Sequence, residues 1–291
     1  MKEIYKDISL TAICSLFGKS RQGWYQLAEK NGQKQLKQNL VLEQVRQIKS
    51  QLPHTGGIKM HFMLQQFMAA HQISMGRDAL FSMLKDNNLL VKPRKLYAKT
   101  TNSFHHYRKW PDLVQRRKAI MAEEIWVSDI TYLRTKKGFI YLSLVTDAWS
   151  RKIVGYNLSR NLKAEGCVKA FQMALKARLY PNRPLIHHSD RGIQYCCDAY
   201  VQLLMNQKVQ ISMTQNGSPY DNAIAERVNG ILKQEFDLYQ AFESFQEAKQ
   251  TVEQAILHYN LIRPHFSCEL KTPQSKHASI NPIECKEQLV E

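Results

Sequence analysis

The stretch WVSDITY, residues 126–132, alternates apolar and polar side chains and carries an aspartate at its centre. Alternation with a period of two predicts a β-strand. A carboxylate inside a strand is disfavoured by β propensity and by the free-energy cost of removing a charge from water. Asp129 is therefore a candidate functional residue, and an exposed position on an edge strand is its ordinary alternative.

The segments that follow extend this strand into a sheet. Strands are expected at 125–133, 139–148 and 152–159, and their short connections favour an antiparallel meander. Further elements are then expected in this order: helix 163–179, strand 184–188, helix 196–206, strand 209–213, and helices 222–238 and 244–261. This order predicts a mixed α/β fold, with helices on both faces of a five-stranded sheet.

Two further carboxylates stand at informative places. Asp190 follows the strand 184–188 within HHSDRGIQY, residues 187–195, and functional residues gather at the carboxyl ends of strands in such sheets. Glu226 lies in the first turns of the helix 222–238. Asp190 pairing with a nearby arginine, and Glu226 as a solvated helix residue, are the ordinary alternatives. Taken together with Asp129, the order and spacing favour one shared site.

A shared site of three carboxylates points to divalent cations. Clustered carboxylates repel one another unless cations neutralise them, and oxygen ligands suit Mg²⁺ or Mn²⁺. Two such ions, about 4 Å apart, stabilise the attacking and leaving oxygens of a phosphoryl displacement. His187 and His188 adjoin Asp190 and are expected to be supporting residues.

The helix after residue 222 has two distinct faces. Glu226, Asn229 and Lys233 are spaced i, i+3 and i+7, and this spacing puts them on one face. Apolar residues form a separate stripe suited to packing on the sheet: Ile224, Val228, Ile231 and Leu232. The carboxylate can thus face the site while the helix is anchored by its apolar side.

Charge is distributed unevenly along the 291 residues, whose formal net charge is +16. Residues 1–120 contain 21 Lys and Arg against 7 Asp and Glu, whereas residues 121–291 contain 20 against 18. This asymmetry indicates a basic front half that binds a polyanion, with nucleic acid as the first candidate. A merely soluble basic surface is the alternative, and a membrane surface is disfavoured because no amphipathic basic helix is visible.

The front half reads as helical. Two short helices around Gly18, within 8–28 and with Ser20 capping the second, are expected to form a helix-turn-helix. Further helices are expected over 36–90, where a methionine stripe is most simply core filler, and 91–118 reads as a basic arm. The basic residues expected to contact DNA here are Arg21, Arg77, Arg94, Lys95, Arg116 and Arg117.

Several classes of protein are disfavoured. The six cysteines form no CxxC pairs, so a zinc finger and a disulfide framework are not expected. The chain has no run of eighteen apolar residues, and its first residues lack a secretion signal, so we expect neither a membrane span nor export.

These residues and motifs resemble those of the orfB-type transposases of insertion sequences, which belong to the superfamily of retroviral-integrase-like DDE enzymes. The segments that carry the resemblance are 126–132, 187–195, 218–229, Tyr259-Asn260 and Arg263-Pro264-His265. The resemblance implies that Asp129, Asp190 and Glu226 are both the catalytic residues and the metal ligands. It also implies a DNA-contacting role for Lys233, an RNase H-like core, two Mg²⁺ or Mn²⁺ ions per site and no organic cofactor.

The resemblance further implies how the chain works. We expect cleavage of double-stranded DNA at the terminal repeats of a transposon and strand transfer of the 3′-hydroxyl into target DNA. The expected partners are DNA, further copies of this chain and an orfA-type protein or fusion, in the cytoplasm of a bacterium and near its nucleoid. The zinc-binding domain of retroviral integrases is absent, and so is the leucine zipper that an orfA product would supply.

The predicted organisation has four parts: a helical DNA-binding region over 1–90, a basic linker over 91–120, an RNase H-like integrase core over 121–240, and a C-terminal helix and tail over 241–291. Two alternative functions remain at this point. The first is a DNA-binding regulator derived from a transposase, without catalytic activity. The second is a nuclease of the RNase H type that lacks specific end binding.

Overall fold

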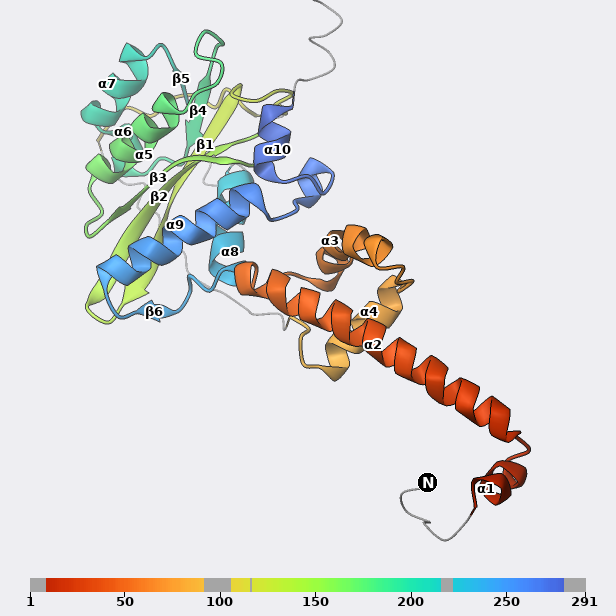
Figure 1. Cartoon of the computed structure of the whole chain (residues 1–291). Coiled ribbons are helices and arrows are strands. Elements are labelled where there is room, and N and C mark those ends of the chain that lie inside the picture. Colours follow the sequence, from red (N-terminus) through yellow and green to blue (C-terminus); the bar gives the residue numbers. More distant parts are fainter. Residues whose placement is uncertain (1–8, 92–105, 116, 216–221, 280–291) are drawn as a thin grey trace, which may run out of the picture. The chain divides into compact units, whose positions relative to one another are not determined.

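The computed structural model describes residues 9–91, 106–115, 117–215 and 222–279 (Figure 1). The chain divides into two compact units, one made of residues 1–51 and 55–91 and the other of residues 52–54 and 92–291. Within the described ranges, no helix combines the length and the apolar character that crossing a bilayer requires.

The first unit is helical. It contains α1 (Leu10–Leu16), α2 (Arg21–Gln51), α3 (Gly57–Ala70) and α4 (Arg77–Asp86). Its core joins Val41 and Val45 of α2 to Met60 and Leu64 of α3, with Leu80 of α4 against them. Met60 is fully buried, so the interpretation of the methionine stripe as core filler is confirmed.

The helix α2 corrects the prediction of a short second helix followed by a separate helical block from residue 36. Arg21–Gln51 form one uninterrupted helix of 31 residues. Gly32 is the expected weak point, but an interior glycine costs only about 1 kcal/mol, and the surrounding Lys, Gln, Leu and Glu residues favour a helix. Ser20 does cap the helix as predicted, since its hydroxyl accepts a hydrogen bond from the Gly23 N–H at 3.0 Å.

The second unit is built on a mixed sheet. Its strands are β1 (Ile125–Thr135), β2 (Gly138–Asp147), β3 (Ile153–Ser159), β4 (Ile186–Ser189), β5 (Gln210–Met213) and the short β6 (Ala241–Phe242). The main strands lie in the order β3-β2-β1-β4-β5, and β6 pairs with β1. The meander β1–β3 is antiparallel, whereas β4 and β5 run parallel to β1. The predicted RNase H-like core, with a mixed five-stranded sheet, is confirmed.

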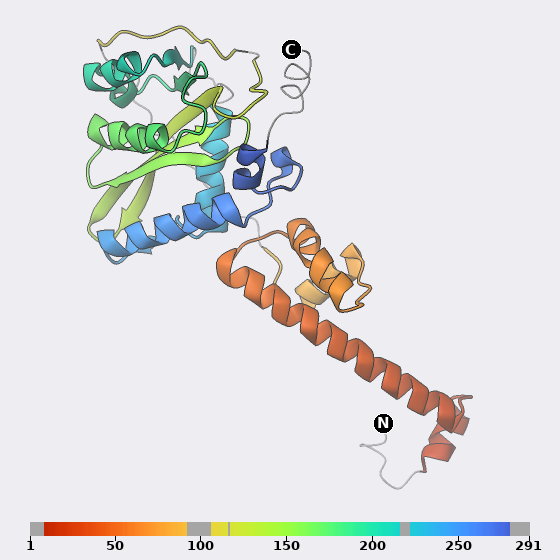
Figure 2. The same cartoon turned by 45° about the horizontal axis from the view of Figure 1, so that its top comes forward.

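Helices cover both faces of this sheet (Figure 2). One face carries α5 (Ala164–Lys176), α6 (Ile193–Cys196) and α7 (Asp198–Asn206), and the other carries α8 (Ala223–Glu235) and α9 (Phe245–Leu261). A Cβ atom at Gly155 of β3 would lie 2.2 Å from the Ala170 carbonyl oxygen of α5, so only glycine allows this close approach. The helix predicted at 196–206 is α7, which begins at Asp198 because Cys197 has an extended backbone, and the short α6 before it was not predicted.

Two short helices near the end of the chain were not predicted from the sequence. They are the 3₁₀ turn Phe266–Cys268 and the helix α10 (Pro273–Ala278). The signal for α10 was present: the Thr272 hydroxyl caps it by accepting from the Ser275 N–H, and Pro273 occupies its first position.

Part of the segment expected to be a basic linker packs on the sheet. The Met213 N–H of β5 donates to the Pro111 carbonyl at 3.2 Å, and the Leu113 N–H donates to Ser212 Oγ at 2.9 Å. Trp110 packs against the hydrophobic core beside them. Apolar packing and hydrogen bonds to β5 therefore hold residues 110–113 in place, and the Arg108 guanidinium lies over the Trp110 ring at 4.3 Å from its centre.

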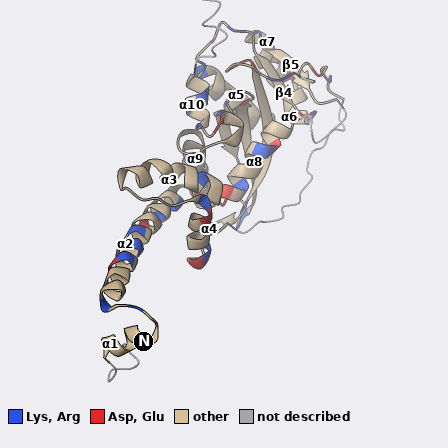
Figure 3. Cartoon of the chain, turned by 90° about the vertical axis from the view of Figure 1, so that its right-hand side faces the viewer, with Lys and Arg blue, Asp and Glu red and all other residues tan. Residues whose placement is uncertain are grey.

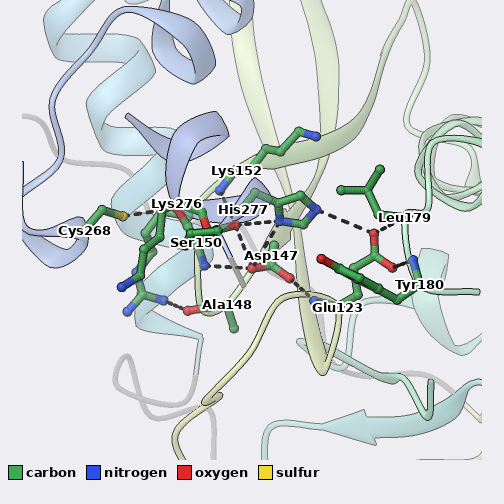
Figure 4. A network of polar contacts seen from close by, with 12 residues as sticks. Glu123, Asp147, Ala148, Ser150, Lys152, Leu179, Tyr180, Cys268, Lys276 and His277 are labelled. Carbon is green, nitrogen blue, oxygen red and sulfur yellow. Dashed lines mark hydrogen bonds and ion pairs between the residues drawn. The ribbon is translucent and has the colours of Figure 1, made fainter. Parts of the chain in front are cut away.

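A buried network of charged side chains joins the start of β1 and the end of β2 to α10 (Figure 4). The Asp147 carboxylate at the end of β2 accepts from the Glu123 N–H and from the N–H and hydroxyl of Ser150, at 2.7 Å each. Glu123, just before β1, accepts from the Leu179 and Tyr180 N–H groups at 2.7 and 2.8 Å. His277 of α10 lies between the two carboxylates, with its ring nitrogens 3.5 Å from Glu123 and 3.7 Å from Asp147.

The electrostatics of this network favour a charged histidine. Burial lowers the pKa of His277, but the nearby carboxylates of Asp147 and Glu123 outweigh this and raise it above the ordinary value. The pKa of Glu123 is lowered, because the nearby His277 ring and the hydrogen bonds from the Leu179 and Tyr180 N–H groups outweigh burial. The network thus joins α10 to β1 and β2 through a buried ion pair whose partners are also hydrogen-bonded.

We predict that His277→Ala lowers the free energy of unfolding by about 3 kcal/mol at pH 6, because it removes the cation between two buried carboxylates, of which Glu123 keeps a second one, Arg178, at 3.4 Å. The histidine contributes fully below about pH 6.5 and its contribution is lost as the pH rises through its raised pKa. Urea unfolding at pH 6 and at pH 9 measures both effects. The exposed His71→Ala variant is the control, and an equal loss at both pH values would contradict the prediction.

Candidate functional site

Asp129 stands on the central strand of the sheet. β1 has β2 on one side and β4 on the other, so the alternative of an exposed edge strand is wrong. Asp129 Oδ1 accepts from the Ile130 N–H at 2.9 Å, and Oδ2 accepts from the side-chain amide of Asn229 at 2.7 Å. The aspartate is therefore held by hydrogen bonds from neutral groups on two elements.

The fold brings the two other predicted acids toward Asp129. Asp190 directly follows β4, whose Ser189 pairs with Ser128 of β1, so both aspartates follow paired positions of adjacent parallel strands. The Gly192 N–H donates to Asp190 Oδ1 at 2.9 Å. Glu226 lies in the first turn of α8, which packs on β1 and β2, and its side chain is exposed.

The three acids interact electrostatically. Burial, the charge of Asp190 and, to a smaller extent, the charge of Glu226 raise the pKa of Asp129 to about 7, against opposing hydrogen bonds from Asn229 and Ile130. Partial burial and the charge of Asp190 also raise the pKa of Glu226. Each carboxylate thus makes it harder to ionise the others, which is the electrostatic environment that a cation relieves.

The described residues do not present a finished metal centre. No group of three or more His, Cys, Asp or Glu side chains among them is arranged to hold an ion. Asp129 interacts electrostatically with Asp190 and Glu226, and the assignment of the three acids as metal ligands stays a prediction. The exposed side chain of Glu226, at the start of a helix, is the one with most freedom to rotate.

The two histidines beside Asp190 are buried beneath this surface. His187 Nε2 lies 2.8 Å from Ser128 Oγ and 3.0 Å from the Tyr200 hydroxyl, and burial lowers the pKa of His187 to about 3. His188 Nδ1 lies 2.8 Å from Ser212 Oγ. Both side chains are fully buried, so they support the strands beneath the acids, as expected, and do not reach the surface.

Lys233 faces the acids from the far end of α8. It is half-buried, and its pKa is lowered by burial against the opposing attraction of Asp129. Asn229 and Lys233 both interact with Asp129, so the predicted functional face of the helix, formed by residues 226, 229 and 233, does face the site.

The remaining basic candidates are dispersed. Arg21 is exposed at the start of α2, Arg77 pairs with Asp78 at 3.0 Å on α4, and Arg117 forms an ion pair with Glu124. The other three predicted DNA contacts, Arg94, Lys95 and Arg116, lie outside the described residues. Of the three described arginines, Arg21 and Arg77 stand on separate helices of the first unit, and Arg117 belongs to the second unit.

One basic cluster was not predicted from the sequence. Lys30, Lys34 and Lys37 are exposed, and their spacings of four and three residues put them on one face of α2. Figure 3 shows Lys and Arg positions recurring along this helix. Lys37 Nζ also donates to the Gln72 carbonyl of the same unit at 3.1 Å. The spacing was visible in the sequence, but the predicted short helices end by residue 28 and the next begins at residue 36, so Lys30 and Lys34 fell between the predicted helices.

Comparisons with known proteins show the family of the chain. Models of the integrase core domain match residues 121–219 and 207–273. The chain is 34% identical over 258 residues to the Shigella sonnei protein "Insertion element IS600 uncharacterized 31 kDa protein", covering 87% of this chain and 93% of that one. It is 35% identical over 188 residues to the "Transposase for insertion sequence element IS904" of Lactococcus lactis, covering 62% of this chain and 74% of the relative.

A solved integrase core is a more distant likeness. The structure titled "Structure of the HTLV-2 integrase catalytic core domain in complex with magnesium" is 18% identical, with a TM-score of 0.44, and the match covers 54% of this chain and 98% of that one.

We predict that Asp129→Asn stabilises the metal-free protein at pH 8. In the unfolded chain Asp129 ionises near pH 4, whereas in the folded chain it keeps its proton to about pH 7. As the pH rises from 4 to 7, ionisation of Asp129 therefore favours the unfolded chain and lowers the free energy of unfolding. Allowing for the partial exposure of the side chain, removing the charge should gain about 1–2 kcal/mol, or roughly 3–8 °C in Tm.

Thermal unfolding in a chelator at pH 4 and pH 8 measures this gain. The exposed Asp198→Asn is the matched control and should gain nothing. A Tm for Asp129→Asn that is unchanged or lowered at pH 8 would contradict the raised pKa.

Proposed function

This chain belongs to the orfB-type insertion-sequence transposases with an integrase core domain, and we propose that it cuts DNA at transposon ends and joins them to target DNA. The observation that carries the proposal is the trio Asp129, Asp190 and Glu226. These acids stand on the central strand, directly after its parallel neighbour and on the helix packed against the central strand, and the charge of Asp190 raises the pKa of both Asp129 and Glu226.

The chemistry of the trio suits divalent cations. All three side chains offer carboxylate oxygens, the ligands that Mg²⁺ and Mn²⁺ prefer. The raised pKa of Asp129 reflects burial and negative charge that the attraction of Lys233 does not outweigh, and a metal ion would neutralise this charge. We assign Asp129, Asp190 and Glu226 as the ligands of two ions. Bound there, the ions would supply charge neutralisation at the phosphate and a lowered pKa for the attacking oxygen.

The proposed reaction has two phosphoryl transfers. Water first attacks the phosphodiester at the transposon end, and the bond to the 3′ oxygen breaks, leaving a 3′-hydroxyl. That hydroxyl then attacks a phosphodiester of the target, forms a new ester bond and displaces the target's own 3′ oxygen as a hydroxyl. Lys233 would contact a DNA phosphate next to the acids, since a lysine acts as a flexible point charge.

The first unit would hold the DNA end. Its face with Lys30, Lys34 and Lys37 presents three positive charges at helical spacing, a pattern that follows a phosphate backbone. Recognition of terminal repeats, assembly of several copies on DNA and action with an orfA-type protein belong to the same proposal. A transposase-derived regulator would bind without cutting, and a plain nuclease would cut without joining.

We predict that Asp129→Asn, Asp190→Asn and Glu226→Gln each abolish cutting and joining while DNA affinity changes less than about threefold. The reason is that each substitution removes a metal ligand and at most one negative charge near the DNA. Labelled transposon-end duplexes with a target plasmid, in Mg²⁺ or Mn²⁺, separate cutting from joining, and a binding assay runs in parallel. Full activity in any one of the three variants would remove that acid from the site.

We predict that the triple variant Lys30→Gln, Lys34→Gln, Lys37→Gln binds DNA more weakly than the wild type, and that its affinity depends less on salt concentration. For every phosphate that the variant no longer neutralises, the slope of log K against log salt concentration should become shallower by about 0.9. The control is the triple variant Lys163→Gln, Lys169→Gln, Lys176→Gln. It removes the same charge from α5 and the residue before it, on the sheet face opposite α8. Equal slopes for the triple variant and the wild type would exclude these lysines as phosphate contacts.

A further inference from the structure

Two buried asparagines, Asn222 directly before α8 and Asn229 within it, hold two successive residues of β1. The Asn222 side-chain amide donates to the Ser128 carbonyl at 3.0 Å, and the Asn229 amide donates to Asp129 Oδ2 at 2.7 Å. Only 6% of Asn222 and 5% of Asn229 is exposed. Glu226 lies between them in the sequence, four residues after one and three before the other, on the same face of the helix.

These two contacts fix where α8 lies along β1. The other buried side chains of the helix include Val228, Ile231 and Leu232, whose hydrophobic packing has little directional preference. Hydrogen bonds require particular atoms at particular distances. The asparagines therefore determine which turn of α8 stands beside Asp129, and that turn carries Glu226.

The chemistry of the amide suits a site for cations. A lysine or arginine in the place of Asn229 would hold the Asp129 carboxylate but also cancel its charge and compete with a metal ion. A neutral amide donor fixes the orientation of the carboxylate and leaves its charge intact. The Oδ1 atoms of both asparagines are buried and accept no hydrogen bond from the described residues, which is unusual for a side chain present only for stability.

We propose that Asn229 is a positioning residue of the metal site, which holds the Asp129 carboxylate in the orientation that binds the cation, while Asn222 sets the place of Glu226 beside it. This inference rests on the proposed function, because it takes Asp129 and Glu226 as ligands. Residues that orient metal ligands in this way usually contribute 10–100-fold to metal affinity.

Calorimetric titration of the whole chain with Mn²⁺ tests the proposal on Asn229→Leu, which has a similar volume and no donor, and on the smaller Asn229→Ala. We expect Mn²⁺ to bind 10–100-fold more weakly in both variants. In end-cleavage assays, the Mn²⁺ concentration for half-maximal rate should rise by the same factor, and saturating Mn²⁺ should restore most of the rate. A purely structural role would lower the rate at every Mn²⁺ concentration instead.

Asn260→Ala is the matched control, because the Asn260 side chain bonds both the N–H and the carbonyl of Ile153, at 3.0 and 2.9 Å, on another strand. It should lower Tm and leave Mn²⁺ affinity unchanged. If a folded Asn229 variant bound Mn²⁺ with wild-type affinity while Asp129→Asn abolished binding, the inference about Asn229 would be overturned and the proposed metal site would stand. Wild-type affinity in Asp129→Asn itself would instead remove the proposed metal site.

Discussion

A carboxylate in the central strand of a sheet is the constraint on which the rest of the catalytic unit depends. Asp129 is partly withdrawn from water, and the charges of Asp190 and Glu226 add to the free-energy cost of ionising it. The hydrogen bonds that offset this cost come from neutral donors, the Ile130 N–H and the Asn229 amide. The sheet therefore stabilises the geometry of the acid without neutralising its charge.

Two other buried acids of the same sheet, Asp147 and Glu123, have their charges balanced, unlike Asp129. Asp147 and Glu123 are more deeply buried than Asp129, yet each receives several hydrogen bonds and both face His277. Their charges are balanced within the protein, so their role is to join α10 to β1 and β2. Asp129 instead keeps a raised pKa despite its hydrogen bonds, and this difference separates a candidate binding site from a structural ion pair.

Positive charge precedes the acids in the sequence and is shared by both units. The first 120 residues contain 21 Lys and Arg against 7 Asp and Glu, while residues 121–291 are nearly neutral overall. Residues 92–120, which belong to the second unit, supply more than half of that excess. The local concentration of acids would repel DNA, and the basic residues of both units offset that repulsion, because electrostatic attraction to phosphates acts largely independently of sequence.

The sequence by itself determined the sheet, the three acids and the functional face of α8. Strand alternation around Asp129 and the 3.6-residue period of residues 222–238 are local properties, and they predicted element type and order closely. The sequence did not determine the length of α2, because the cost of Gly32 is small and depends on the whole helix. It also could not pair Asn229 with Asp129 or His277 with Asp147, since residues 100 or more positions apart meet only when the sheet order and the helix packing are set.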